Sequence, residues 1–159
     1  MSKVRYRYAV REDVPLILYF IQQIAEYEKL SHEVIATEES LDKWIFDKEA
    51  AEVLFVLEGE KEVGFALFFQ NFSTFQGRCG LYLEDIYILP QYRKKGYGKG
   101  LFIELARIAV DRGLGRMDWF CLDWNQNSID FYKSLGAIAM DEWTVYRLTG
   151  DALEKLGKK

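Results

Sequence analysis

The chain has 159 residues, half of them hydrophobic and 16% aromatic, and a formal net charge of −4. This length predicts a single domain, residues 1–159, with enough apolar side chains for a buried core. No apolar run reaches the roughly 18 residues of a membrane span, and the acidic balance argues against a nucleic-acid binder. Cys79 and Cys121 lack the spacing of metal ligands or of a disulfide framework. We therefore expect a cytoplasmic protein that uses no metal and contacts no membrane.

The first half of the chain has the periodicities of one strand, two amphipathic helices and a hairpin. Helix starts are indicated by Asp13 with Pro15 and by Thr37 as an N-cap. The expected elements are a strand over 4–8, a helix over 13–28, a shorter helix from Thr37 with Leu41, Trp44 and Ile45 buried, and strands over 51–58 and 62–70. Polar residues and glycines then predict a loop over 71–80.

The second half alternates strands with helices. The expected elements are a strand over 82–89, a helix over 101–112, a strand over 117–123 with Cys121 packed in the core, a helix over 128–135, a strand over 144–148 and a last helix with a capping box at Asp151 and Glu154. The order β-α-α-β-β-β-α-β-α-β predicts a mixed sheet of the α/β class (an α+β mixed sheet) with helices on both faces.

A basic, glycine-rich turn joins the 82–89 strand to the 101–112 helix. Pro90 ends the strand because it has no amide hydrogen to donate. The turn that follows contains Arg93, Lys94, Lys95, Gly96, Tyr97, Gly98 and Lys99. Such a turn before a helix binds phosphate through backbone amides, the helix dipole and basic side chains, although solvated lysines on a surface turn are the alternative. The Walker and dinucleotide patterns do not fit, because Gly100 and Leu101 occupy positions that those motifs reserve for other residues.

Acid–base chemistry in this chain falls to carboxylates, tyrosines or lysines. The one histidine, His32, lies in a polar connector and is expected at the surface, so we expect neither a histidine-based triad nor a histidine–metal site. Glu84 and Asp85 are neighbours in an apolar strand and point to opposite faces. At least one carboxylate is then buried and available as a base with a raised pKa, unless the strand lies at an edge and both are solvated. Tyr132 is either a proton donor or an aromatic packing residue.

The motif Arg93-x-x-Gly96-x-Gly98 after a strand resembles the pyrophosphate-binding signature of the GNAT superfamily of acyl-CoA-dependent N-acetyltransferases. Longer stretches, among them 82–88, 91–93, 124–125 and 128–137, are similar to one branch, the diamine (spermidine/spermine) and thialysine N-acetyltransferases. The resemblance covers nearly the whole chain. It implies a GNAT-like fold, acetyl-CoA as cosubstrate, a small cationic amine as acceptor and a homodimer.

The resemblance also implies a role for each matching residue. Tyr132 matches the proton donor, and Glu84 matches the carboxylate that acts on the amine. Tyr27, Glu28 and Asp85, together with Glu84, match residues that bind the cationic substrate. The residues implied for acetyl-CoA are Ile86, Tyr87 and Ile88 beside the pantetheine arm, Arg93, Lys94, Lys95, Gly96, Tyr97, Gly98 and Lys99 around the pyrophosphate, and Asn125, Gln126, Asn127 and Ser128 on the far side of the cofactor.

One departure from that branch leaves the identity of the acceptor amine open. The 71–80 stretch lacks the acidic residue that the polyamine enzymes carry there, so a short diamine or a thialysine-like amino acid is as good a candidate as a polyamine. Two other functions are compatible with the sequence. One is a protein or peptide N-acetyltransferase, and the other is a non-catalytic CoA-binding module.

Overall fold

The computed structural model describes residues 4–158. The chain separates into two units, residues 1–120 and 121–159, and each is described by itself. Within the described residues, no helix is both long and apolar enough to cross a bilayer.

Five strands of the first unit form one sheet in the order β1-β2-β3-β4-β5. In chain order they are β1 (Val4–Tyr8), β2 (Glu52–Glu58), β3 (Lys61–Ser73), β4 (Arg78–Ile88) and β5 (Met117–Trp119). Neighbouring strands are antiparallel except β4 and β5, which are parallel. The predicted mixed sheet of the α/β class is confirmed.

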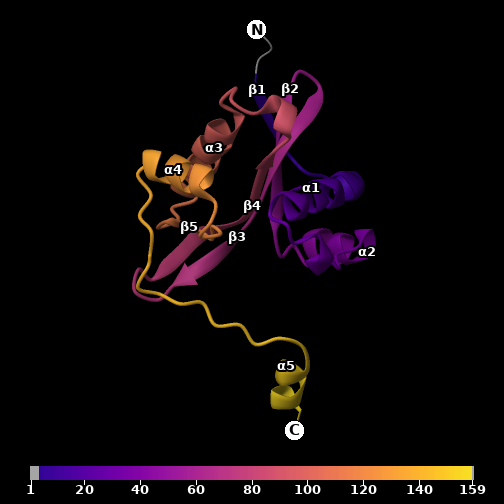
Figure 1. Ribbon diagram of the computed structural model, residues 1–159, viewed down its shortest axis with the longest axis vertical. Helices are drawn as coiled ribbons and strands as arrows, with labels where there is room; N and C mark the ends of the chain where they lie inside the picture. The colour runs from indigo at the N-terminus through magenta and orange to yellow at the C-terminus, as the bar shows by residue number, and fades with distance from the viewer. Residues whose placement is uncertain (1–3, 159) are drawn as a thin grey trace. The chain divides into compact units, whose positions relative to one another are not determined.

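Helices cover both faces of this sheet. In the first unit they are η1 (Arg11–Asp13), α1 (Val14–Tyr27), η2 (Ser31–Glu33), α2 (Glu38–Leu41), the π-helix η3 (Asp42–Asp47), η4 (Pro90–Tyr92) and α3 (Tyr97–Asp111). Figure 1 shows α1 and α2 on one side of the sheet and α3 on the other. β2 is buried continuously from Val53 to Leu57, as expected for a strand that is covered on both faces.

The core beneath α1 is aromatic. Phe20 of α1 stacks on Phe65 of β3 with ring centroids 5.1 Å apart, and its ring lies 6.0 Å from that of Phe55. All three side chains are fully buried. Buried aromatic pairs contribute about 0.5–1.5 kcal/mol beyond their buried area. This packing fixes α1 on the sheet and thereby fixes the position of the residues at its C-terminal end.

The second unit contains two helices, α4 (Gln126–Ser134) and α5 (Gly150–Gly157). Asn125 is the N-cap of α4, and its side-chain oxygen accepts from the Ser128 amide at 3.3 Å. The strand expected over 144–148 is wrong, because these residues form neither helix nor strand. The capping box expected at Asp151 and Glu154 is also wrong, because the N-cap of α5 is Thr149 and its side chain makes no capping bond.

Two further predictions are wrong in the first unit. The expected loop over 71–80 is mostly strand, since Asn71–Ser73 pair with Arg78–Gly80 across a turn at residues 74–77. Trp44 is 54% exposed rather than buried. The wider π-helical turn of η3 breaks the 3.6-residue spacing on which that expectation relied, and Phe46 packs against the core instead.

The end of the first unit also differs from expectation. β5 stops at Trp119, so the strand expected over 117–123 is shorter, and Cys121 lies outside it and is half-buried. The helix expected from Leu101 begins at Tyr97. His32 lies in η2 with its side chain 72% exposed, and its expected surface position is confirmed.

Candidate active site

The basic turn leads directly into the N-terminus of α3. Gly96 is the N-cap, with a φ of 87° that favours glycine. The first helical hydrogen bond runs from the Gly100 amide to the Gly96 carbonyl, at 2.9 Å. The amides of Tyr97, Gly98 and Lys99 therefore have no acceptor within the helix. A Cβ added at Gly96 would meet no described atom within 4 Å, and one at Gly98 would touch only Ile88, at 3.8 Å. The turn thus leaves open space in front of amides that can bind an anion.

The four basic side chains of the turn have different partners. Lys94 and Lys99 are exposed and form no ion pair within residues 4–158. Lys95, in contrast, pairs with Glu58 at 3.1 Å. The Arg93 guanidinium stacks against the Tyr27 and Tyr87 rings. Two of the four cations expected around the pyrophosphate are therefore committed within the protein.

Arg93 faces the C-terminal end of α1. Its guanidinium lies 5.2 Å from the ring centroid of Tyr27 and 5.0 Å from that of Tyr87, and its Nε donates to the Ile88 carbonyl at 2.9 Å. The two rings also contact each other, with centroids 6.3 Å apart. Stacking and this hydrogen bond direct the Arg93 side chain toward Tyr27. Its expected role at the pyrophosphate stays a prediction.

One edge of β4 is open beside this turn. β5 pairs with β4 only from Leu81 to Leu83. The Leu89 amide donates to the Val63 carbonyl at 2.9 Å. Since the backbone groups of successive strand residues point alternately to the two neighbouring sides, those of Tyr87 point to β3. Those of Ile86 and Ile88 point to the open edge. Of the three residues expected beside a pantetheine arm, Ile86 can therefore offer its amide and carbonyl. Ile88 can offer its amide, since its carbonyl accepts from Arg93 Nε. Tyr87 cannot, because β3 already uses its amide and carbonyl.

A β-bulge lies at Glu84. Leu67 pairs with Asp85 and Phe68 with Leu83, so Glu84 has no partner residue on β3. A bulge bends the strand and re-aims the side chains around it. Glu84 is exposed and Asp85 is partly buried. The expectation that one of these neighbouring carboxylates is buried holds for Asp85.

Three carboxylates come together at this bulge. Burial, and then repulsion by Glu84 and Glu28, raise the pKa of Asp85 to about 7. Burial, and then repulsion by Glu84, also raise the pKa of Glu28. No ion pair within residues 4–158 includes any of the three. The structure brings together three of the four residues expected to bind a cationic substrate, and the fourth, Tyr27, directly precedes Glu28 in the chain. No group of three or more metal-ligating side chains suited to a metal ion occurs among the described residues.

The remaining predicted residues lie in the second unit. Gln126, Asn127 and Ser128 form the first turn of α4. Asn125 caps that turn through its side chain. Tyr132 is half-buried in the same helix, and its ring lies 5.8 Å from that of Phe131. A common reaction centre for Tyr132 and Glu84 stays a prediction.

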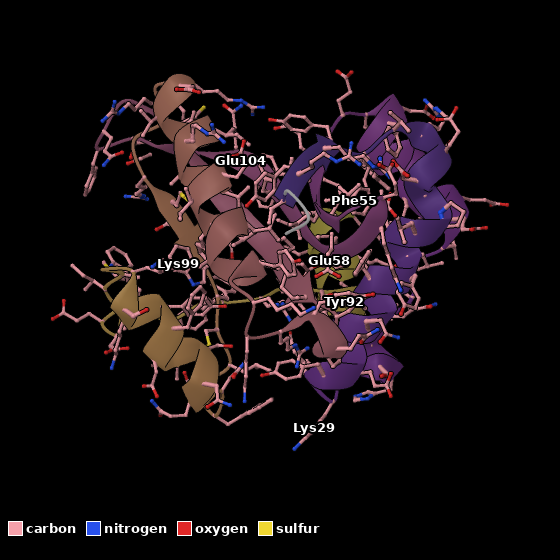
Figure 2. The ribbon with its side chains drawn as sticks, turned by 90° about the horizontal axis from the view of Figure 1, so that it is seen from above. Lys29, Phe55, Glu58, Tyr92, Lys99 and Glu104 are labelled. Carbon is pink, nitrogen blue, oxygen red and sulfur yellow. The ribbon has the colours of Figure 1, made fainter. Side chains whose placement is uncertain are left out.

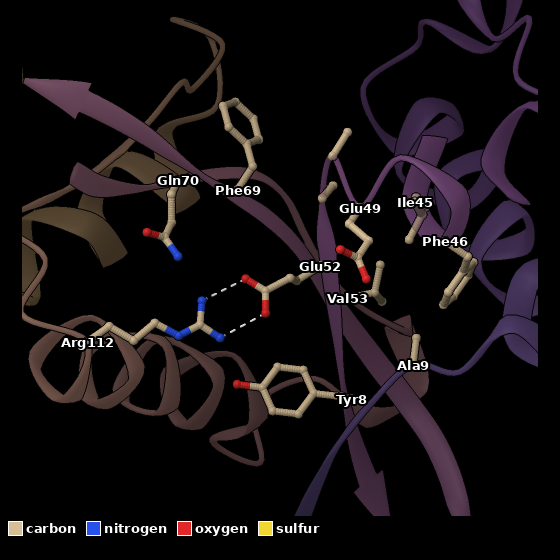
Figure 3. Close-up of a pocket in the computed structure, with 12 residues that line it drawn as sticks. Tyr8, Ala9, Ile45, Phe46, Glu49, Glu52, Val53, Phe69, Gln70 and Arg112 are labelled. Atoms are coloured by element: carbon tan, nitrogen blue, oxygen red, sulfur yellow. Dashed lines mark hydrogen bonds and ion pairs between the residues drawn. The ribbon is translucent and has the colours of Figure 1, made fainter. Parts of the chain in front are cut away.

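A cavity of about 590 Å³ lies elsewhere in the first unit (Figure 3). It is lined by Tyr8, Ala9, Ile45, Phe46, Glu49, Ala50, Ala51, Glu52, Val53, Phe69, Gln70 and Arg112. Both Arg112 terminal nitrogens donate to the Glu52 carboxylate, at 2.7 and 2.8 Å. None of the residues predicted for the site lines this cavity, so its size alone does not identify the reaction centre.

Sequence reasoning missed Glu58, which accepts from the turn residues Lys95 and Tyr97. No motif links a glutamate at the end of β2 to a turn almost forty positions later. The pairing of β2 with β3 and of β3 with β4 brings the two segments together.

Comparison with known proteins agrees with this geometry. Residues 18–137 match the family model described as the acetyltransferase (GNAT) family. The chain is 37% identical to the thialysine N-epsilon-acetyltransferase of Bos taurus, over all of both chains. It is 34% identical to the L-ornithine N5-acetyltransferase of Arabidopsis thaliana, over 97% of this chain and 88% of that protein.

Solved structures resemble the fold as well. An integron cassette protein of V. cholerae matches with a TM-score of 0.82 and 28% identity, over 100% of this chain and 99% of that one. An aminoglycoside acetyltransferase from a soil metagenome matches with a TM-score of 0.78 over 93% of this chain and 97% of that one, at 17% identity. The resemblance inferred from the motifs is confirmed: the chain belongs to the GNAT family of acetyltransferases and is an amine N-acetyltransferase.

Proposed function

We propose that the enzyme transfers the acetyl group of acetyl-CoA to a primary amine of a small cationic substrate, either a diamine, a polyamine or a thialysine-like amino acid. The observation that carries the proposal is the cluster of Glu28, Glu84 and Asp85, which has no cationic partner within residues 4–158. A cationic substrate would supply the missing charge. The names of the relatives, a thialysine and an ornithine acetyltransferase, support an amino acid with a side-chain amine.

The cluster also suits the proton chemistry of the reaction. A primary amine has a pKa of about 10.4, so at neutral pH nearly all of it is protonated and cannot attack a thioester. The exposed Glu84 carboxylate meets the ammonium group first, and Asp85, whose pKa is about 7, retains the proton. Glu28 and Tyr27 hold the rest of the cation. Direct attack by the freed amine needs no nucleophile from the protein.

Acetyl-CoA, which members of this family use, supplies the activated thioester. The amides of Tyr97, Gly98 and Lys99 would bind its pyrophosphate, and Lys94 and Lys99 would neutralise it. The open edge at Ile86 and Ile88 would bind the pantetheine arm as an added strand and polarise the thioester carbonyl. Residues 125–128 would hold the far side of the cofactor.

Tyr132 would donate a proton to the departing thiolate. A thiol has a pKa of about 8.5 and a tyrosine one of about 10, so a neutral tyrosine is available as donor at neutral pH. This role requires both units to act as one acetyltransferase domain. The family model spans the boundary between them, which supports that arrangement.

The proposed assembly is a homodimer in the cytoplasm. Trp143 is 75% and Tyr146 is 92% exposed in a segment without secondary structure. Large aromatic side chains in that setting are typical of an interface with another chain.

A thiol-release assay with acetyl-CoA and a panel of amines tests the proposal. The panel contains putrescine, spermidine, ornithine, lysine, thialysine and a histone-like peptide. We expect the highest kcat/KM with one of the small amines. Faster turnover of the peptide would reassign the enzyme to protein substrates. Tight binding of coenzyme A without acetylation of any amine would indicate a regulatory CoA-binding module.

A further inference from the structure

We infer that Glu58 is a positioning residue for the phosphate-binding turn, a role that rests on the proposed binding of acetyl-CoA there. Glu58 is the last residue of β2, and it contacts the turn from a neighbouring part of the sheet. In Figure 2, Glu58 and Tyr92 lie together, while Lys99 lies apart from them on α3. Through Glu58 the sheet holds the turn in the conformation that presents its amides.

One carboxylate oxygen of Glu58 holds both sides of Gly96. The Tyr97 hydroxyl donates to Oε1 at 2.6 Å, and the Lys95 ammonium donates to the same oxygen at 3.1 Å. Gly96 lies between these two residues in its left-handed conformation, where the chain enters α3. Restraining both neighbours restrains the dihedral angles of Gly96. It therefore restrains the direction in which the first amides of the helix point.

The Tyr97 ring anchors this contact in the protein interior. Tyr97 is only 6% exposed, whereas the Glu58 side chain is 29% exposed. The hydrogen bond to Glu58 raises the pKa of Tyr97 to about 12. The bonds from Tyr97 and Lys95 lower the pKa of Glu58. The hydroxyl thus keeps its proton and the carboxylate keeps its charge throughout the neutral range.

The same contact divides the lysines of the turn into two kinds. The Lys95 ammonium lies between Glu58 and the Tyr92 ring, 5.3 Å from the ring centroid, so its charge is compensated inside the protein. Lys94 and Lys99 form no ion pair within residues 4–158 and are left for an anion. Glu58 therefore sets how the turn is built and which of its charges act on a bound phosphate.

The test compares two glutamates at the same end of the sheet. Glu58→Gln keeps the size and the acceptor oxygen but removes the charge. The matched control is Glu60→Gln, since among the described residues Glu60 pairs only with Arg5, and its side chain is 93% exposed. Calorimetric titration with coenzyme A gives Kd, and steady-state kinetics with a good amine give KM for acetyl-CoA and kcat. Thermal unfolding checks that each variant is folded.

We expect Glu58→Gln to raise Kd and KM about 10-fold, the usual effect of losing a charged hydrogen bond. We expect kcat at saturating acetyl-CoA to change less than about two-fold, because the reacting groups are untouched. Tyr97→Phe should raise Kd and KM to a similar extent. The double variant should have a Kd no higher than that of the weaker-binding single variant, because both substitutions remove the same contact. Glu60→Gln should match the wild type.

Two results would overturn the inference while leaving the proposed function intact. One is wild-type affinity in both Glu58→Gln and Tyr97→Phe. The other is tighter binding in Glu58→Gln, which would mean that Glu58 only withholds Lys95 from the phosphates. Failure of the wild type to bind coenzyme A would overturn the inference and the proposed function together.

Discussion

In the first unit, a cluster of three carboxylates and the single carboxylate of Glu58 have opposite electrostatic environments. Glu28, Glu84 and Asp85 have no ion-pair partner within residues 4–158, and burial and mutual repulsion raise the pKa values of Glu28 and Asp85. Glu58 accepts from Tyr97 and Lys95, and its pKa falls. The compensated carboxylate maintains the architecture of the turn. The uncompensated cluster retains an electrostatic cost that a cationic ligand would relieve, so it marks where chemistry is expected.

The largest expected effect comes from removing the proton acceptor of the uncompensated cluster. Asp85→Asn should lower kcat/KM for a good amine by about 100- to 1,000-fold near neutral pH, since an amide cannot accept the proton. Activity should recover partly in alkali, where free amine is abundant. Rates measured between about pH 6 and pH 10 check this. Asp118→Asn, on β5 and paired with Arg116, is the control. A deficit of equal size at every pH would contradict the assigned role.

Tyr132→Phe tests whether the second unit completes the reaction centre. We expect a loss of about 100-fold in kcat, with KM for the amine nearly unchanged, because only the departing thiolate loses its proton donor. Steady-state kinetics between about pH 6 and pH 9 measure it. Tyr19→Phe removes a hydroxyl from an exposed tyrosine of α1 and should leave turnover unchanged. Wild-type kinetics in Tyr132→Phe would exclude it as the donor.

A carboxylate with a raised pKa, such as Asp85, and one with a lowered pKa should make the free energy of unfolding change with pH in opposite directions. The folded pKa of Asp85 is about 7 against 3.8 for the free group, so the folded state binds the proton more tightly and loses stability as pH rises between these values. Asp85→Asn removes that loss. It should add up to about 4 kcal/mol to the free energy of unfolding above pH 7, and little near pH 4.

Asp13 provides the matched variant with the opposite sign. Hydrogen bonds from Arg7, at 2.7 and 2.9 Å, lower its pKa. Its contribution is therefore present above about pH 4 and is lost in acid. Asp13→Asn should cost about 1–3 kcal/mol at neutral pH and less in acid. Urea unfolding at several pH values measures both variants, and parallel pH dependences would contradict the contrast.

The smallest expected effect concerns the two kinds of lysine in the turn. Lys99→Gln should weaken coenzyme A binding a few-fold and reduce its salt dependence, because an uncompensated charge is lost. The double variant Lys95→Gln/Glu58→Gln removes both charges of an ion pair and should leave the salt dependence unchanged, because Glu58 already neutralises Lys95. Titrations at about 50 and about 300 mM salt measure both slopes. Equal slopes for the two variants would show that Lys95 also acts on the phosphates.

Much of this arrangement is predictable from local sequence. Alternation predicted β1, and the order of the elements predicted the mixed sheet. The Gly96-x-Gly98 spacing predicted a turn into a helix because glycine adopts the left-handed conformation at little cost. The adjacent pair Glu84-Asp85 predicted a carboxylate in an apolar setting, because neighbouring strand residues face opposite ways.

What failed depends on contacts between distant residues. The 71–80 stretch looks like a loop by composition, but pairing between β3 and β4 extends both strands through it. α3 begins at Tyr97 and not at Leu101, although its first turn contains two poor helix formers, Gly98 and Gly100. At Gly100 a side chain would collide with the Tyr6 hydroxyl of β1, a contact invisible in the local sequence. The placements of Arg93 and Glu58 likewise require the folded sheet.

The bare stretch of β4 beyond Leu83 has a consequence for handling the protein. Unused amides and carbonyls along an edge can template the addition of any extended polypeptide, which is how many sheet proteins aggregate. In the proposed reaction the pantetheine arm covers that stretch and blocks the addition of another strand. The ligand-free enzyme would then be prone to aggregate, and coenzyme A in storage buffers would keep concentrated samples monodisperse.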